Sequence, residues 1–247
     1  MAAGEGGAPH IVVINPENGA LVRSWFGYST AFRGGLFIAV GDVNNDGIDD
    51  LVTGPNAGGG PHIKVYDGKN NQVIFEFMAY APSFTGGVSV TLADANNDGR
   101  MDIITGTGKG GGPHVKAFDA TNGAELVSFM AYSPDFRGGV FVAAGDIDGN
   151  GSTEIVTGTG VGGGPHVGVF NLQTRTLLRG FFAYDSSVRT GVRVGLSDRN
   201  GDGILDIFTG PGPGGGPHVK VFDGLSLGLI DSFFAGAIDD LNGVYVN

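Results

Sequence analysis

The sequence contains no cysteine, so neither disulfide bonds nor thiolate metal sites can stabilise its fold. It also has no apolar run approaching the roughly 20 residues that a helix needs to cross a bilayer, so we expect no membrane insertion. Basic residues are scarce, with 14 Lys and Arg against 25 Asp and Glu and a formal net charge of -11. This balance argues against a partner with a phosphate backbone, and nucleic acid is not expected as a ligand.

Glycine is the unusual part of the composition, with 48 of 247 residues, yet the chain also has 17 Phe and 6 Tyr. This aromatic content is enough for a sizeable core, so the glycines are expected to separate short strands rather than to mark a disordered chain. We expect one domain over residues 1–247. Residues 1–9 show no charged segment followed by an apolar one, so no signal peptide is predicted.

A repeat of 52 residues organises the whole sequence. The segment Gly-Gly-Gly-Pro-His places its histidine at His62, His114, His166 and His218, and Gly-Ala-Pro-His places another at His10. No insertion or deletion breaks this register. It divides the chain into units 7–58, 59–110, 111–162 and 163–214 and a partial unit 215–247.

Each unit contains four short apolar or β-branched runs, which we name A, B, C and D. In the first complete set they are Leu36 to Val40, Leu51 to Thr53, His62 to Tyr66 and Gln72 to Met78. Four strands in a period of this length are typical of a propeller blade, while helical repeats would show a 3.6-residue rhythm. A β-solenoid is the other all-β interpretation, but its coils are far shorter. The sequence therefore predicts an all-β, five-bladed β-propeller of four-stranded antiparallel blades.

The fifth blade is expected to be shared between the two ends of the chain. Five full units would need thirteen residues more than are present, and in the register the chain begins at strand C and stops after strand A. The shared blade therefore lacks strand B and the A–B loop. Three arrangements stay open: a three-stranded blade, one patched by residues 1–6, and one completed by a neighbouring chain. The chain is accordingly either a monomer or an oligomer formed through this incomplete blade.

Between A and B, four loops share the pattern Asp-x-Asn/Asp-x-Asp/Asn-Gly-x-x-Asp/Glu. Oxygen-bearing side chains fill positions 1, 3, 5 and 9, and glycine at position 6 permits the sharp turn that brings them together. Such an oxygen-only set suits Ca²⁺, with the backbone carbonyl of position 7 as a further ligand. The predicted ligands are Asp42, Asn44, Asp46, Ile48 and Asp50; Asp94, Asn96, Asp98, Arg100 and Asp102; Asp146, Asp148, Asn150, Ser152 and Glu154; and Asp198, Asn200, Asp202, Ile204 and Asp206.

Two other interpretations of these loops are weaker. A β-turn rich in Asn, Asp and Gly needs only one or two such residues, not four in fixed register. An EF-hand needs flanking helices and a Glu at position 12, where this chain has a threonine inside an apolar strand. We therefore predict about four Ca²⁺ sites, and we prefer Ca²⁺ to Mg²⁺ because Mg²⁺ favours octahedral geometry and retained water. The third loop has a neutral Asn150 and a longer Glu154, so we expect it to bind most weakly.

In the 52-residue unit, Asp-x-Asn-x-Asp-Gly-x-x-Asp is followed by Leu/Ile-Val-Thr-Gly-Pro or Thr-Gly-Thr. This unit resembles the FG-GAP (VCBS-like) repeats of integrin α-subunit propellers and of secreted bacterial proteins. The resemblance covers essentially the whole chain and implies calcium in the loop between strands A and B. The chain departs from it at Phe32 to Gly35 and at Thr53 to Pro55, where the family name expects Phe-Gly and Gly-Ala-Pro. Because family members are mostly extracellular, the resemblance also implies a secreted or cell-surface origin.

The face of the ring opposite the acidic loops is expected to gather the repeated histidines and tyrosines. One hypothesis makes it a set of shallow sites for a sugar or a peptide, formed by His62, His114, His166, His218, Tyr80, Tyr132 and Tyr184. The alternative, which we favour, is that the histidines bond to neighbouring backbone while the rings fill wedges between blades.

No catalytic constellation is confined to one unit, so the chain is not expected to be an enzyme. The sequence predicts a calcium-binding propeller that acts as a binding, adhesion or scaffold domain for a protein or carbohydrate ligand that it does not identify. The alternatives are a multivalent lectin and an engineered or recently amplified repeat protein without a specific ligand.

Overall fold

The computed structural model describes residues 1–4 and 6–246, and all regular structure within them is β-strand. None of these residues forms a helix with the length and hydrophobicity of a membrane span. The strands are β1 (His10–Ile14), β2 (Leu21–Phe26), β3 (Leu36–Gly41), β4 (Asp50–Pro55), β5 (His62–Tyr66), β6 (Val73–Met78), β7 (Val88–Ala93), β8 (Asp102–Thr107), β9 (His114–Phe118), β10 (Glu125–Met130), β11 (Val140–Gly145), β12 (Glu154–Thr159), β13 (His166–Asn171), β14 (Leu177–Phe182), β15 (Val192–Ser197), β16 (Asp206–Pro211), β17 (His218–Phe222) and β18 (Leu229–Phe234).

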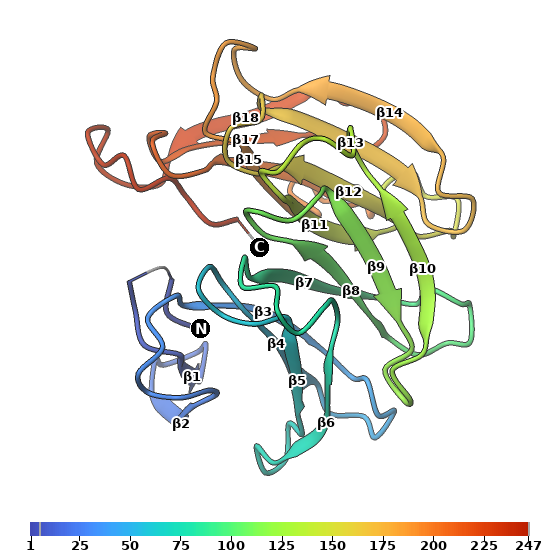
Figure 1. Cartoon of the computed structure of the whole chain (residues 1–247). Coiled ribbons are helices and arrows are strands. Elements are labelled where there is room, and N and C mark those ends of the chain that lie inside the picture. Colours follow the sequence, from blue (N-terminus) through green and yellow to red (C-terminus); the bar gives the residue numbers. More distant parts are fainter. Residues whose placement is uncertain (5, 247) are drawn as a thin grey trace.

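The strands form a β-propeller whose blades surround a common centre (Figure 1). Four blades are antiparallel four-stranded sheets, β3 to β6, β7 to β10, β11 to β14 and β15 to β18, in which each strand pairs with the next along the chain. Their first strands lie innermost and contact one another, whereas their fourth strands lie at the outside. The prediction of an all-β propeller with four-stranded antiparallel blades is therefore confirmed, and four such blades are complete among the described residues.

The core lies between neighbouring blades. Val52 and Ile63 of one blade pack in the same cluster as Val88 and Ile103 of the next. The second strands β8 and β12 are buried at every residue because sheets cover both of their faces. Close approach also explains a repeated glycine, since a Cβ on Gly106 would lie 2.5 Å from the carbonyl oxygen of Val140 in the next blade.

The fifth sheet contains β1 and β2 and is extended by the first residues of the chain. Ala2 bridges Ile11, the Met1 amino nitrogen donates to the Val12 carbonyl oxygen at 2.7 Å, and the Val12 amide donates to the Met1 carbonyl oxygen at 2.9 Å. In the 52-residue register Ala2 corresponds to Gly54, so the chain begins in the last residues of strand B. The expectation that it begins at strand C is wrong, and a patch by N-terminal residues is the arrangement observed.

Each end of the chain contacts one of the two complete blades that flank this fifth sheet. At the N-terminal side the Leu36 amide donates to the Ala3 carbonyl oxygen at 2.9 Å, and at the C-terminal side the Val244 amide donates to the Pro211 carbonyl oxygen at 3.1 Å. The Tyr245 hydroxyl accepts a hydrogen bond from Asn56 Nδ2 at 3.3 Å. The C-terminal segment thus lies against the last complete blade, and the Tyr245 side chain connects it to the first complete blade.

Candidate metal centre

The acidic loops connect the first and second strands of the four complete blades. Position 1 follows directly after the first strand, and position 9 is the first residue of the second strand. The backbone hydrogen bonds between the first and second strands therefore hold both ends of each loop. Because the strands run in the same order in every blade, all four loops lie on one face of the ring.

The position 1 carboxylate organises the turn of each loop. In the second loop, the amide of Gly99 donates to Asp94 Oδ2 at 2.8 Å and the amide of Asp98 donates to Oδ1 at 3.1 Å. Position 6 donates in the same way in the other loops. Gly99 has a φ of +84°, a left-handed conformation that explains the glycine at this position. Position 4 is left-handed as well, and asparagine or glycine fills it in every copy.

Positions 3 and 5 accept hydrogen bonds from the loop backbone. In the second loop the Asp98 amide donates to Asn96 Oδ1 at 2.9 Å, and the Arg100 amide donates to Asp98 Oδ1 at 2.9 Å. Each of these oxygens keeps a second lone pair that a cation can use. In the first loop, Lys69 Nζ lies 2.7 Å from Asp46 Oδ2, and this ion pair lowers the pKa of Asp46.

Position 9 carries a buried carboxylate in every loop. Asp102 is 2% exposed, and it accepts hydrogen bonds from the Ala95 amide of its own loop at 3.0 Å and from the Ala120 amide of the β9–β10 turn at 3.4 Å. Asp50 and Asp206 make the same two kinds of contact. Burial raises the pKa of Asp102 to about 6, although the two amides act in the opposite direction. These three aspartates therefore brace the A–B loop against the C–D turn.

The third loop differs because its position 9 residue is Glu154. The amide of the β13–β14 turn, at Leu172, donates to the Thr153 carbonyl oxygen at 3.3 Å instead of to the position 9 carboxylate. Glu154 Oε2 accepts a hydrogen bond from the Ile147 amide at 3.3 Å, while Oε1 is buried without a hydrogen-bond partner. Burial raises the pKa of Glu154, and the carboxylates of Asp148 and Asp146 raise it further.

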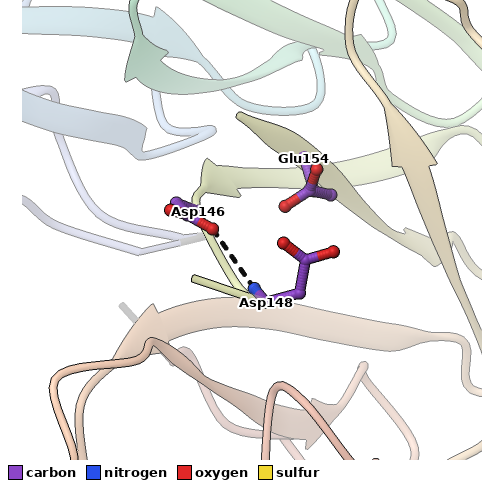
Figure 2. A group of neighbouring side chains, drawn as sticks. All are labelled: Asp146, Asp148 and Glu154. Carbon is purple, nitrogen blue, oxygen red and sulfur yellow. Dashed lines mark hydrogen bonds between the residues drawn. The ribbon is translucent and has the colours of Figure 1, made fainter. Parts of the chain in front are cut away.

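Asp146, Asp148 and Glu154 turn their carboxylates toward one another (Figure 2). One oxygen of each lies within 4.8 Å of the others, and within the described part of the chain this is the one such trio of His, Cys, Asp or Glu. Three carboxylates at this separation repel one another, and a buried oxygen without a partner is costly. A hard divalent cation would offset both effects, so the donor set fits Ca²⁺. Which of the twenty predicted positions contact an ion stays a prediction.

On the opposite face, the tyrosines predicted as possible ligand contacts lie between blades, because each hydroxyl bonds to two strands of the blade that follows. The Tyr80 hydroxyl donates to the carbonyl oxygens of Thr105 at 3.2 Å and His114 at 2.9 Å, and burial raises its pKa. Tyr28, Tyr132 and Tyr184 make the same pair of contacts.

The histidines bond to side chains of the fourth strand rather than to backbone. His114 Nε2 lies 2.8 Å from Ser128 Oγ, and the same pairing occurs at His10 and His218. His62 Nε2 lies 3.2 Å from Glu76 Oε2, and the ring of His166 lies next to Gly180, which offers no side chain. A role of these residues toward a ligand stays a prediction.

Sequence reasoning missed a layer of residues on the axis. Phe37, Ser89, Phe141, Arg193 and Tyr245 share one place in the register and line a cavity of about 220 Å³. Arg193 is 5% exposed, and its guanidinium carbon lies 3.7 Å from the centre of the Tyr245 ring. A signal was present, because this position carries four residue types while the positions on either side are aliphatic in every unit.

Comparison with known proteins agrees with this architecture. Residues 42–105, which contain the first two loops, match the family model of the FG-GAP-like repeat. Integrin alpha-V of Gallus gallus is 33% identical over 93 residues, which cover 37% of this chain and 8% of the integrin. Integrin alpha pat-2 of Caenorhabditis elegans is 41% identical over 85 residues, which cover 32% and 6%. The matches thus span less than a tenth of the length of these curated relatives, and the resemblance to FG-GAP repeats is confirmed.

Proposed function

Because the chain carries FG-GAP-like repeats on a β-propeller, we propose that it is a calcium-binding, non-enzymatic binding or adhesion domain. Its four acidic loops would hold about four Ca²⁺ ions, and its partner would be a protein or a carbohydrate. The likeness to extracellular FG-GAP proteins supports a place outside the cell or at its surface.

The observation that carries the calcium proposal is the trio in the third loop. Asp146 and Asp148 converge on Glu154, whose Oε1 is fully buried and has no hydrogen-bond partner. Such an arrangement is unfavourable without a cation and favourable with one. It also argues against the expectation that this loop binds most weakly, and we now expect it to bind first.

The face opposite the loops is the better candidate for recognition. Calcium would tie the A–B loops to the rigid strands, whereas the B–C turns and the axial side chains Phe141, Arg193 and Tyr245 surround a hollow of about 220 Å³ on the other side. A lining of apolar and aromatic side chains with a few polar groups among them is typical of binding sites. Metal binding would then stabilise the ring, and this face would meet the partner.

Calorimetric titration and thermal melting test the calcium proposal. After treatment with chelator and dialysis, the protein should take up about four Ca²⁺ ions. Tenfold excess over Kd adds about 1.4 kcal/mol per site, so four sites should raise Tm by roughly 10–20 °C. Mg²⁺ at the same concentration should have a smaller effect. Asp135→Asn removes an exposed carboxylate outside the loops and should leave uptake unchanged. A folded, sheet-rich protein that binds no Ca²⁺ would contradict the proposal.

A further inference from the structure

An Asn-Gly dipeptide lies inside the third acidic loop. Asn150 and Gly151 fill positions 5 and 6, where the other three loops have Asp-Gly. At position 5 the third loop therefore differs from the others only by an amide in place of an acid. Hydrolysis of the Asn150 amide would give this loop the carboxylate that the other three already have.

Asparagine followed by glycine can lose its amide without an enzyme. The backbone nitrogen of the glycine attacks the side-chain carbonyl carbon, and a five-membered imide forms as ammonia leaves. The two groups are tethered in one dipeptide, and glycine has no Cβ that would hinder the attack. Both residues are exposed here, and a Cβ placed on Gly151 would meet no atom within 4 Å. Water can therefore reach the imide and open it.

Two hydrogen bonds around Asn150 favour this reaction. The Gly151 amide donates to Asp146 Oδ2 at 2.8 Å, so a carboxylate can take the proton of the attacking nitrogen. The Ser152 amide donates to Asn150 Oδ1 at 2.7 Å, so a donor faces the oxygen on which negative charge develops. Within the described residues the Asn150 Nδ2 group donates no hydrogen bond, so no contact of the folded chain opposes its departure.

The other Asn-Gly dipeptides of the chain lack this combination. In three of them the glycine amide donates to a backbone carbonyl oxygen, which is a far weaker base than a carboxylate; these are Asn18-Gly19, Asn122-Gly123 and Asn242-Gly243. In the fourth loop Gly201 does donate to a carboxylate oxygen, Asp198 Oδ1, at 2.7 Å. There, however, Asn200 Nδ2 donates to Asp202 Oδ2 at 2.9 Å, and this bond holds the amide in place.

We propose that Asn150 is a site of spontaneous deamidation. Gly151 N attacks Asn150 Cγ and gives its proton to Asp146, the bond from Cγ to Nδ2 breaks, and ammonia leaves with that proton. Water then adds to the imide and breaks one of its two carbon–nitrogen bonds. A carboxylate is left at residue 150, in an aspartate or an isoaspartate. The reaction needs no oxidant, no cofactor and no second protein.

The product changes the third loop as a metal site. Asp146, Asp148 and Glu154 already bring carboxylate oxygens within 4.8 Å of one another, and Glu154 Oε1 is buried without a hydrogen-bond partner. A further negative charge at position 5 raises the repulsion in the loop without metal and raises the attraction for a divalent cation. This consequence rests on the proposed calcium function, whereas the deamidation itself does not.

Mass spectrometry of the folded chain tests the reaction. The protein is incubated with chelator in warm, mildly alkaline buffer, and its proteolytic peptides are measured over time. The peptide with Asn150 should change from amide to acid first, and it should take up one ¹⁸O atom in ¹⁸O-labelled water. The peptide with Asn122 is the internal control and should react about tenfold more slowly or less. In denaturant, where the contacts of Asp146 are lost, the two rates should converge.

Two variants separate the chemistry from the fold, and circular dichroism shows whether each is folded. Asp146→Asn removes the proton acceptor and should slow the loss of the Asn150 amide about tenfold or more, while the rate at Asn122 stays unchanged. Asn150→Gln keeps an amide but would have to close a larger ring, so it should stay unconverted. Equal rates at Asn150 and Asn122 in the folded wild-type protein, or an unchanged Asn150 rate in a folded Asp146→Asn protein, would overturn the proposal.

Asn150→Asp reproduces one product and tests its consequence. It should lower Tm in chelator, and it should bind Ca²⁺ at one site about tenfold more tightly than the wild-type protein. Asn18→Asp adds the same charge at an exposed turn outside the acidic loops and should change neither value. An unchanged Ca²⁺ affinity in Asn150→Asp would overturn the metal consequence alone. Failure of every variant to take up Ca²⁺ would instead contradict the proposed function and leave the mass measurement standing.

Discussion

The blade β7 to β10 and the blade β11 to β14 share their strands, their turns and their place in the ring, yet they use position 9 of the acidic loop differently. In the first blade Asp102 braces its loop against the neighbouring turn. In the second, one additional methylene moves the Glu154 carboxylate away from that turn and toward Asp146 and Asp148. The difference teaches that one buried carboxylate can serve either as a brace or as part of a metal cluster, and side-chain length selects between the two.

Exchanging the two residues tests this difference most strongly. Glu154→Asp should return the carboxylate to the Leu172 amide and take it out of the trio. We expect the Ca²⁺ affinity of the third loop to fall tenfold to a hundredfold, while stability without metal should rise because the buried oxygen gains a partner. Titration calorimetry and melting in chelator measure the two effects.

The reciprocal change provides the control. Asp102→Glu should release the Ala120 amide and lower stability without metal, and it should move the position 9 carboxylate toward those of Asp94 and Asp98. Equal Ca²⁺ affinities for the wild-type and Glu154→Asp proteins would show that side-chain length does not select the role.

The pH dependence of stability without metal should show a smaller effect, which comes from Asp102 in the second loop. The folded-state pKa of Asp102 is about 6, above its ordinary value of 3.8, mainly because the group is buried. Its contribution to stability without metal is therefore fully present below about pH 4 and is lost as the pH rises through about 6.

Asp102→Asn identifies the group responsible. This variant should lose the rise in stability on acidification that the wild-type protein shows in chelator between pH 7 and pH 4. If both proteins follow the same curve in a series of melting experiments, Asp102 is not the titrating residue.

The smallest expected effect concerns the other end of the same blades. Ser128 bonds to His114, whereas the matching Gly180, which lies next to the His166 ring, offers no side chain for this contact. Gly180→Ser should stabilise the protein by about 0.5–1 kcal/mol, because it supplies a hydrogen bond and removes a glycine from a strand. A Cβ at residue 180 would lie 3.0 Å from the end of the flexible His166 ring, which must shift slightly.

The matched change is Ser128→Gly, which should cost a similar amount. Denaturant unfolding of both variants measures the pair. A loss of stability in both would mean that crowding at His166 outweighs the new bond.

Much of this architecture could be predicted from the sequence because a strict repeat shows the same pattern of apolar, glycine and acidic residues several times. The runs of apolar residues predicted the strands, and the glycine at position 6 predicted the left-handed turn that Gly99 adopts. The start of the chain could not be placed by apolar pattern, because Met1 to Ala3 replace Thr53 to Pro55 with residues that carry no strand signature.

The convergence in the third loop could not be predicted for a different reason. Sequence pattern treats Asp and Glu at position 9 as equivalent oxygens with arms of different length. The length matters only because the Leu172 amide lies where an aspartate would reach it, and the Thr153 carbonyl replaces that partner. This is a fact of packing between two loops, and neither loop shows it alone.

The axial layer has a consequence for how such a chain changes over time. Every other repeated contact involves one or two blades, but Phe37, Phe141, Arg193 and Tyr245 meet across the ring, each from a different blade. A substitution between two blades therefore affects those two blades, whereas a substitution in this axial layer affects several blades at once. Duplication of units would preserve the blades and leave the residues of the axial layer free to diverge. Two propellers with the same blades would therefore differ first in the size and the chemistry of their central cavity.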